Sequence, residues 1–478
     1  MLFNSLEFGI FLPLVFLCYW LINPRGLKSQ NLFLLLASYF FYACWDWRFL
    51  FLILASTIVD YSTGLALART TEAFRRKLWL GLSIGLNLGI LGFFKYYNFF
   101  LENFTEAFSF LGLAISARPL QIILPVGISF YTFQTLSYTI DIYRKKIEPV
   151  QDFIAFAGFV SFFPQLVAGP IERASNLLPQ FLQNRRFDYA QATDGMRQIL
   201  WGLFTKVVIA DSCAYLADPI FKTPSDYSAS TLVVGAMLFS FQIYGDFSGY
   251  SNIAIGTARL FGFNLQQNFA FPYFSRNIAE FWRRWHISLT SWFKDYLYIP
   301  LGGSRGGMRR TIRNVFIVFM ISGFWHGARW NFLAWGLLHA LYYLPSLVGQ
   351  RNRRYLNKVA DKQLLPSLQE FSQMVFTFGL VTFAWIFFRA EGINLALDYI
   401  RQLFRPSLFS FPEIFPAWIF GAILLLVLVE WLNRDKKHAL EWDTVSIGQA
   451  WRWVVYLVLC FLIAFFMGNP NPFIYFQF

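Results

Sequence analysis

Residues 314–348 read NVFIVFMISGFWHGARWNFLAWGLLHALYYLPSLV, and Arg329 carries the single formal charge in this stretch. Two apolar runs, 314–325 and 330–348, lie on either side of the short turn FWHGAR. A helix that crosses the hydrocarbon core of a bilayer needs about 20 mainly apolar residues. We therefore predict that the chain enters a membrane here, turns at a histidine between two glycines, and returns.

The composition extends this prediction to the whole chain. Of 478 residues, 56% are hydrophobic, 21% are aromatic and only 14% are charged, against about 25% charged residues in ordinary soluble domains. These values exclude a soluble multidomain protein and a disordered chain. The length leaves room for about ten to thirteen transmembrane or re-entrant helices. The predicted fold class is an all-α polytopic membrane protein, in which residues 1–478 form a single membrane-embedded domain.

Most of the predicted helices are apolar runs that end at basic clusters. The run 31–43 is short, and we expect it to be half of a bent hairpin. Residues 281–293 form an amphipathic pattern, which predicts one helix along the membrane surface or re-entering it. The remaining runs are 8–22, 49–68, 78–100, 120–143, 153–168, 196–210, 229–262, 372–388, 415–432 and 451–468.

The net charge is +13, and the distribution of the basic residues between loops gives the predicted orientation. Alternate loops divide into two sets, one with 22 Lys and Arg residues and one with 5. By the positive-inside rule, the first set is cytoplasmic and both termini lie outside the cytoplasm. This distribution accounts for the excess of basic residues, so we predict no nucleic-acid partner. The N-terminal run lacks a preceding positive charge and a cleavage site, so we expect a retained span.

His326 is the sharpest single feature of the sequence. It lies twelve residues after Asn314, about 18 Å along a helix, whereas the hydrocarbon core is about 30 Å thick. This places the side chain beyond the midplane from the cytoplasm. An ionisable group at that depth is a candidate functional residue. The alternative, left open by the residues alone, is a neutral histidine that ties two helices together.

Three further groups of polar residues have both a structural and a functional interpretation. His286 lies at the rim of the apolar face of 281–293, where it could be hydrogen-bonded at the membrane interface. Asp246 follows Gly245 in an apolar run and could orient a site group or pair with an arginine. Four basic residues lie in or near the glycine-rich turn 302–307: Arg305, Arg309, Arg310 and Arg313. They could attract the phosphates of a cytosolic donor such as coenzyme A. The positive-inside rule also explains their presence.

The other histidines give no metal site. His339 lies in the apolar run 330–348, where we expect it to pack, and His438 follows two lysines, where we expect it to be solvated. The four histidines are dispersed and lack a neighbouring ligand set, so no zinc site is predicted.

Six separated strings together resemble the membrane-bound O-acyltransferase (MBOAT) family, and within it the bacterial branch that acetylates alginate. Two positions depart from the family pattern: Gly245 stands where a bulkier residue is expected, and Asn252 where Asp is expected. The strings occur in the family's order and are densest between about residues 120 and 345: PVGISFYTFQTLSYTIDIYR (125–144), FFPQLVAGPIER (162–173), QIYGDFSGYSNIAIG (242–256), FPYFSRNIAEFWRRWHISLTSWFKDYLYIPLGG (271–303), ISGFWHGARWNFLAWGLLHA (321–340) and FIYFQF (473–478).

The resemblance implies helices around a central cavity and a catalytic histidine at His326. It makes His286 a supporting residue, and Asp246 and Arg144, which lie in two of the strings, are further supporting candidates. The implied location is the inner membrane of a bacterium. The implied reaction moves an acyl group, most simply acetyl, from acetyl-CoA or another acyl thioester to an exported polysaccharide, with no bound cofactor. A second, periplasmic protein is the expected relay.

In the expected mechanism, His326 is kept neutral by desolvation and acts as general base on the acceptor hydroxyl. Peptidoglycan O-acetylation and D-alanyl transfer to teichoic acid are alternatives within the enzyme class. A transporter or channel with a histidine in a proton path is the alternative outside it. Transporters usually contain internal repeats, and none is visible among the motifs.

Overall fold

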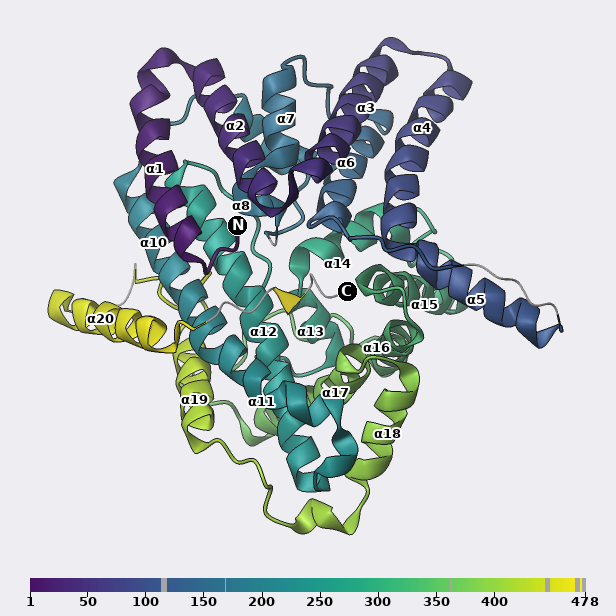
Figure 1. Ribbon diagram of the computed structural model, residues 1–478, viewed down its shortest axis with the longest axis vertical. Helices are drawn as coiled ribbons and strands as arrows, with labels where there is room; N and C mark the ends of the chain where they lie inside the picture. The colour runs from purple at the N-terminus through teal and green to yellow at the C-terminus, as the bar shows by residue number, and fades with distance from the viewer. Residues whose placement is uncertain (113–117, 168, 362, 443–447, 469–472, 475–478) are drawn as a thin grey trace. The chain divides into compact units, whose positions relative to one another are not determined.

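The structure is a computed structural model that describes residues 1–112, 118–167, 169–361, 363–442, 448–468 and 473–474. Every regular element in these residues is a helix (Figure 1), which confirms the all-α prediction. The chain divides into two compact units, one of Met1–Ala192 with Thr257–Leu265 and one of Thr193–Gly256 with Gln266–Phe478. The expectation of a single domain stays a prediction.

Helices of the first unit follow the predicted apolar runs with several differences. The run 153–168 divides at Phe162 into two helices, and no predicted run covers the helix Ala174–Phe181. The run predicted as half of a bent hairpin is a complete helix, α2, because its helical pattern continues on both sides of residues 31–43. The run 120–143 becomes helical only from Ile128, after Gly127 at a φ of +75°. The helices are α1 (Leu6–Ile22), α2 (Leu27–Asp46), α3 (Leu50–Arg69), α4 (Ala73–Leu91), α5 (Tyr97–Phe110), α6 (Ile128–Tyr143), α7 (Phe153–Ser161), α8 (Phe163–Leu166) and α9 (Ala174–Phe181).

The second unit contains the sequence around His326. Helix α10 begins just before the unit boundary, and α12 extends just beyond it. The helices are α10 (Tyr189–Leu203), the π-helical η4 (Phe204–Ala210), α11 (Asp211–Lys222), α12 (Ala229–Leu260), α13 (Ile278–Arg284), α14 (Ile287–Phe293), the π-helical η7 (Lys294–Tyr298), α15 (Gly307–His326), α16 (Trp330–Val348), α17 (Leu368–Arg389), α18 (Ile393–Leu403), α19 (Ala417–Leu432) and α20 (Gln449–Phe466).

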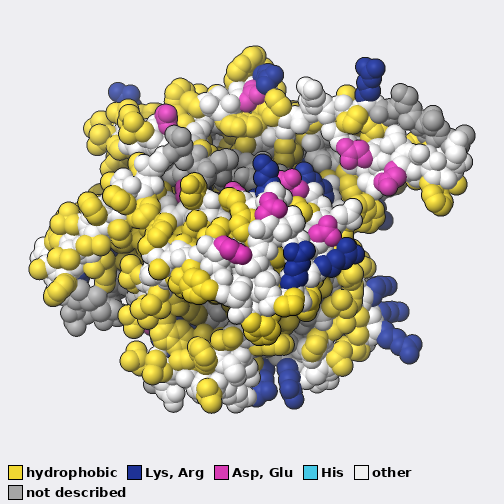
Figure 2. All heavy atoms as spheres, turned by 60° about the horizontal axis from the view of Figure 1, so that its bottom comes forward, with side chains coloured by type: hydrophobic (Ala, Val, Ile, Leu, Met, Phe, Trp, Pro, Cys, Tyr) yellow, Lys and Arg dark blue, Asp and Glu magenta, His cyan; other side chains and the backbone are white. Residues whose placement is uncertain are grey.

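Six helical segments in the described residues are long and apolar enough to cross a membrane. Helix α17, whose Phe388 lies beside His326, is among them, whereas α15 and α16 are not. Apolar side chains cover much of the face shown in Figure 2, as expected for a protein that faces lipid. The six segments are Leu6–Arg25, Leu27–Arg69, Ala73–Phe110, Tyr189–Lys222, Leu368–Arg389 and Gln449–Phe466.

Helices α15 and α16 lie side by side (Figure 1) and approach each other at two glycines. A Cβ on Gly336 would lie 2.5 Å from the carbonyl oxygen of Phe319, and a Cβ on Gly323 would collide with the carbonyl oxygen of Phe332. Small residues allow such close helix packing in membrane proteins. The turn between these helices therefore has little freedom, and His326 is the last residue of α15.

A buried carboxylate connects three helices of the first unit. Asp60 in α3 accepts hydrogen bonds from the Ser83 hydroxyl at 2.5 Å and the Asn87 amide at 2.9 Å, both in α4. The Ser83 hydroxyl oxygen also lies within hydrogen-bond distance of the Thr139 hydroxyl in α6, at 3.1 Å. All four side chains are almost fully buried. In surroundings without water, each of these polar groups depends on the others for its hydrogen bonds.

Removing the Asp60 acceptor should therefore destabilise the first unit. We expect Asp60→Leu to leave the donors of Ser83 and Asn87 unsatisfied, at a cost of about 1–3 kcal/mol each. Asp60→Asn keeps one oxygen acceptor and should lose less. Melting temperatures of the purified variants in detergent measure the difference. A leucine variant as stable as the unchanged protein would contradict the role given to this cluster.

Candidate active site

His326 is packed among aromatic rings and is only 3% exposed. Its imidazole lies 5.1 Å from the indole of Trp335 in α16 and 5.3 Å from the ring of Phe388 in α17, measured between ring centroids. On the third side is Trp325, at 4.9 Å. Gly327 continues the chain in an extended conformation. The predicted turn is therefore present, and its aromatic walls hold the imidazole away from bulk water.

His286 belongs to the same aromatic cluster. Trp325 is a neighbour of both histidines, with its ring centroid 6.1 Å from that of His286 and 4.9 Å from that of His326. The single helix predicted for residues 281–293 is wrong. The chain breaks at His286, whose φ of 44° and ψ of 55° are left-handed, so α13 ends before it and α14 begins after it. The break turns His286 away from the predicted rim position and into the protein, where it is 1% exposed.

Asn268 determines which nitrogen of His286 carries the proton. Its side-chain oxygen lies 3.0 Å from Nδ1 of His286 and also accepts from the Ser288 hydroxyl at 2.9 Å. The Ser288 backbone N–H points to the same oxygen, which fixes the orientation of the amide. Because this oxygen only accepts, Nδ1 of His286 must donate. In the neutral ring Nε2 is then the basic nitrogen.

Asp246 is linked to His286 through its neighbour in α12 rather than directly. Its carboxylate forms an ion pair with Lys206 of η4 at 2.7 Å, and it accepts a hydrogen bond from the Ile474 backbone N–H at 2.6 Å. The next residue, Phe247, lies 4.6 Å from the His286 ring in an edge-to-face contact. Asp246 thus pairs with a lysine and not with an arginine, and it fixes the part of α12 that supports His286.

Residues 473–474 also pack beside this cluster. The Phe473 ring lies 5.6 Å from that of Phe247 and 4.7 Å from that of Tyr250. Phe473 and Ile474 are both buried. The other four residues of the FIYFQF motif lie outside the described residues. The described part of this motif therefore belongs to the surroundings of His286, 187 residues earlier in the chain.

The remaining predicted residues lie elsewhere. Arg144 follows the end of α6 in the first unit, so its role at His326 stays a prediction. His339 is buried and packs between Trp282 and Trp335, as expected. The prediction that His438 is solvated is wrong: it is 2% exposed, and Nε2 lies 3.0 Å from the Asp194 carboxylate, which provides a partner inside the protein.

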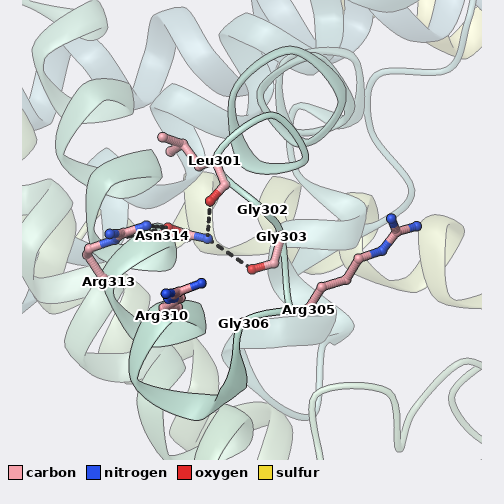
Figure 3. A pocket seen from close by; sticks show the side chains of 8 residues that line it. All are labelled: Leu301, Gly302, Gly303, Arg305, Gly306, Arg310, Arg313 and Asn314. Atoms are coloured by element: carbon pink, nitrogen blue, oxygen red, sulfur yellow. Dashed lines mark hydrogen bonds between the residues drawn. The ribbon is translucent and has the colours of Figure 1, made fainter.

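The four predicted arginines lie at the opposite end of α15 from His326. The helix begins at Gly307, so Arg309, Arg310 and Arg313 are in its first two turns, whereas Arg305 is in the preceding loop. Three of the four line a pocket of about 410 Å³, together with Asn314, and Arg309 does not. Figure 3 shows the Arg310 and Arg313 side chains on the Asn314 side of the pocket and Arg305 extending away.

Several residues of the site have no motif that marks them in the sequence. Asn268 lies in a segment without regular structure, and nothing in the sequence connects it to His286. Trp335 and Phe388 are ordinary members of apolar runs. Lys206 had a usable signal, because a lone lysine within the apolar run 196–210 requires a buried partner. The described residues contain no group of three or more His, Cys, Asp or Glu side chains that could hold a metal ion.

The described part of the chain thus contains a buried histidine at a helix-terminal turn in a protein with several membrane-spanning helices. Residues 140–388, just over half of the chain, match the family model for membrane-bound O-acyltransferases. The chain belongs to this family, and it is a multi-pass membrane protein that acts as an O-acyltransferase. The matched region contains His286 and His326.

Three relatives show the range of names within the family. The "Probable alginate O-acetylase AlgI" of Pseudomonas putida is 34% identical over the full length of both chains. The "Peptidoglycan O-acetyltransferase" of Helicobacter pylori is 32% identical over all of this chain and 98% of its own. The "Teichoic acid D-alanyltransferase" of Streptococcus thermophilus is 29% identical, over 51% of this chain and 62% of its own.

Asn268 should control the rate through the orientation of His286. We expect Asn268→Leu to lower the rate of acyl transfer by about 10- to 100-fold, because a displaced site group costs up to this much. Asn268→Asp keeps the acceptor oxygen and should restore most of the rate. Initial rates and melting temperatures should be measured on both variants. A leucine variant that melts earlier but transfers at the full rate would show a purely structural role.

Proposed function

We propose that the chain transfers an acetyl group from a cytosolic acyl thioester to a hydroxyl group that lies across the membrane, with His326 as general base. The observation that carries this proposal is the position of His326, held between Trp335 and Phe388 at the turn between α15 and α16. Rings on several sides fix the imidazole, and a fixed base within hydrogen-bond reach contributes about 10²–10⁴-fold to a rate. We further propose that the protein lies in the bacterial inner membrane with both termini outside the cytoplasm.

The two histidines would have different roles. His286 is hydrogen-bonded to Asn268, and its ring lies near Trp325, which is also a neighbour of His326. This position suits a residue that lines the site and helps to position the reactants. His326 ends a helix beside a glycine, so the chain after it leaves the helix. Because His326 is 3% exposed, the side chains around it have to move apart when both reactants are present. The aromatic rings around His326 also keep out bulk water, and exclusion of water from a site protects a thioester from hydrolysis.

The full-length similarity to a relative named alginate O-acetylase supports an exported polysaccharide such as alginate as the final acceptor. A peptidoglycan acceptor is supported by a second relative that matches over its whole length. D-alanyl transfer has weaker support, because that relative matches only half of the chain. A long polymer has poor access to a buried histidine, so we propose that a periplasmic protein receives the acetyl group first.

Substituting His326 tests the catalytic role. We expect His326→Ala to lower acetyl transfer by at least about 10²-fold, because the general base is lost. Radiolabelled acetyl transfer in membranes that contain the variant measures the rate. His438→Gln is the matched control, since it changes another buried histidine, one paired with Asp194, and should leave the rate nearly unchanged. Normal labelling by correctly inserted His326→Ala protein would refute the assignment.

Deleting the gene identifies the acceptor. We expect ester-linked acetyl to fall in the secreted polysaccharide, while peptidoglycan acetyl and teichoic acid D-alanine stay constant. Re-expression of the unchanged chain should restore the acetyl content, and His326→Ala should not. A fall in peptidoglycan acetyl alone would replace the polysaccharide by the cell wall as acceptor. Constant acetyl in every polymer would refute acetyl transfer to these acceptors.

A further inference from the structure

His339 has a tautomer that one hydrogen bond determines. The indole N–H of Trp282 donates to Nδ1 of His339 at 3.3 Å. Because an indole N–H can only donate, Nδ1 of His339 must be the acceptor, and the ring must be neutral. The proton of the ring therefore lies on Nε2. This arrangement is the reverse of that in His286, whose Nδ1 donates to Asn268 and whose Nε2 is the basic nitrogen.

Three buried N–H groups near His326 have no hydrogen-bond acceptor among the described residues: Nε2–H of His339 and the indole N–H groups of Trp335 and Trp385. All three side chains are at most 1% exposed, so bulk water does not reach them. Buried polar groups without a partner are rare in folded proteins, because each loses its hydrogen bond to water without a replacement. Three such donors in one cluster indicate that the site binds a group that accepts from them.

The rings that carry these donors contact one another and His326. Trp335 and His339 lie one turn apart on α16, with their ring centroids 4.8 Å apart. Trp385 of α17 stacks on Trp335 at 5.8 Å and lies 6.3 Å from His339. Trp335 also lies 5.1 Å from the imidazole of His326. Two helices thus place three N–H donors in a cluster that begins at the histidine proposed as general base.

Acyl transfer creates a negative charge that such donors stabilise. When a hydroxyl oxygen attacks the carbonyl carbon of a thioester, its proton goes to His326, and the π electrons of the C=O bond move onto the carbonyl oxygen. The C=O bond then re-forms and the C–S bond breaks. The departing thiolate takes the proton from His326, which leaves an ester and a thiol. N–H donors that are held in place and shielded from water stabilise the intermediate oxyanion strongly.

We propose that the N–H groups of Trp335, Trp385 and His339 bind the carbonyl oxygen of the acyl thioester and stabilise its negative charge during transfer. The proposal rests on the transfer function given above and adds three residues to His326. Trp282 is a positioning residue, since its hydrogen bond keeps the proton of His339 on Nε2. The carbonyl group enters when the rings around His326 move apart. An ordered water molecule is the competing occupant.

Removing one N–H group tests the proposal in membranes that contain the full chain. Trp385→Phe keeps an aromatic ring but has no N–H. We expect this variant to lower the maximal rate of transfer from radiolabelled acetyl-CoA about 10²-fold, the effect of losing one oxyanion donor, with little change in KM.

Trp442→Phe is the matched control for this substitution. Trp442 is also buried, and its indole N–H finds no acceptor in the part of the chain that the structure describes, but it packs against Tyr456 of α20. The control variant should transfer at the unchanged rate. Equal losses of rate in Trp385→Phe and Trp442→Phe would overturn the proposal.

His339 provides a second, independent pair of variants. His339→Leu removes the Nε2–H group, and we expect a loss of rate of the same order. His339→Gln supplies an amide N–H near the position of Nε2 and should restore most of the rate. Melting temperatures should be measured on all of these variants. A rate that follows the melting temperature from one variant to the next, with no rescue by glutamine, would reduce the cluster to a packing role and overturn the proposal.

Infrared spectroscopy detects the hydrogen bonds without turnover. In His326→Ala protein, acetyl-CoA labelled with ¹³C at the carbonyl should bind without being consumed. We expect its carbonyl stretch to move to a higher frequency when Trp385→Phe is added, because hydrogen bonds weaken the C=O bond. Identical spectra of the two proteins would overturn the proposal and leave water as the occupant. Consumption of the label by His326→Ala protein would refute the general-base function, while a shifted band would still support the carbonyl site.

Discussion

The contact between the backbones of α15 and α16 is the constraint on which the site depends. At Gly323 and Gly336 there is no room for a Cβ, so the two helices approach until main-chain atoms touch. This contact places Trp335 of α16 against the histidine that ends α15. Without this contact, the backbone of the turn at Gly327 could adopt more conformations. In lipid, where apolar surface gains little from association, close packing of this kind is one of the forces that hold helices together.

Other parts of the second unit strengthen this arrangement from the side. Trp385 of α17 stacks on Trp335, and Phe388 of the same helix covers the His326 ring. Gly245 of α12 lies so close to η4 that a Cβ would be 2.9 Å from the Thr205 carbonyl oxygen. A glycine at this position thus has a packing reason. A bulkier residue there would push η4, and with it Lys206, away from Asp246.

The sequence predicts most of the apolar helices and the turn at His326 well, because both depend on local pattern. Apolar runs and basic clusters mark the helices, and the turn FWHGAR marks the histidine. The break at His286 was missed, because the residues around it continue an amphipathic pattern and only the tertiary contact with Asn268 reveals the left-handed backbone. The start of α15 was also predicted seven residues too late, because a run of arginines looks like a loop when only hydropathy is considered. Long-range partners such as Asn268 and Ile474 leave no local signal.

The hydrogen bond from Ile474 to Asp246 joins residues 228 positions apart. Contacts of such long sequence separation form late, since the entropy of closing the intervening chain has to be overcome first. During synthesis of the chain, Lys206 and Asp246 are produced long before Phe473 and Ile474. Until then, the Asp246 carboxylate of α12 would lack the hydrogen bond from the Ile474 backbone N–H. The completion of this cluster thus depends on the synthesis of residues 473–474, and a nascent chain stalled before them would contain His286 and His326 without these surroundings.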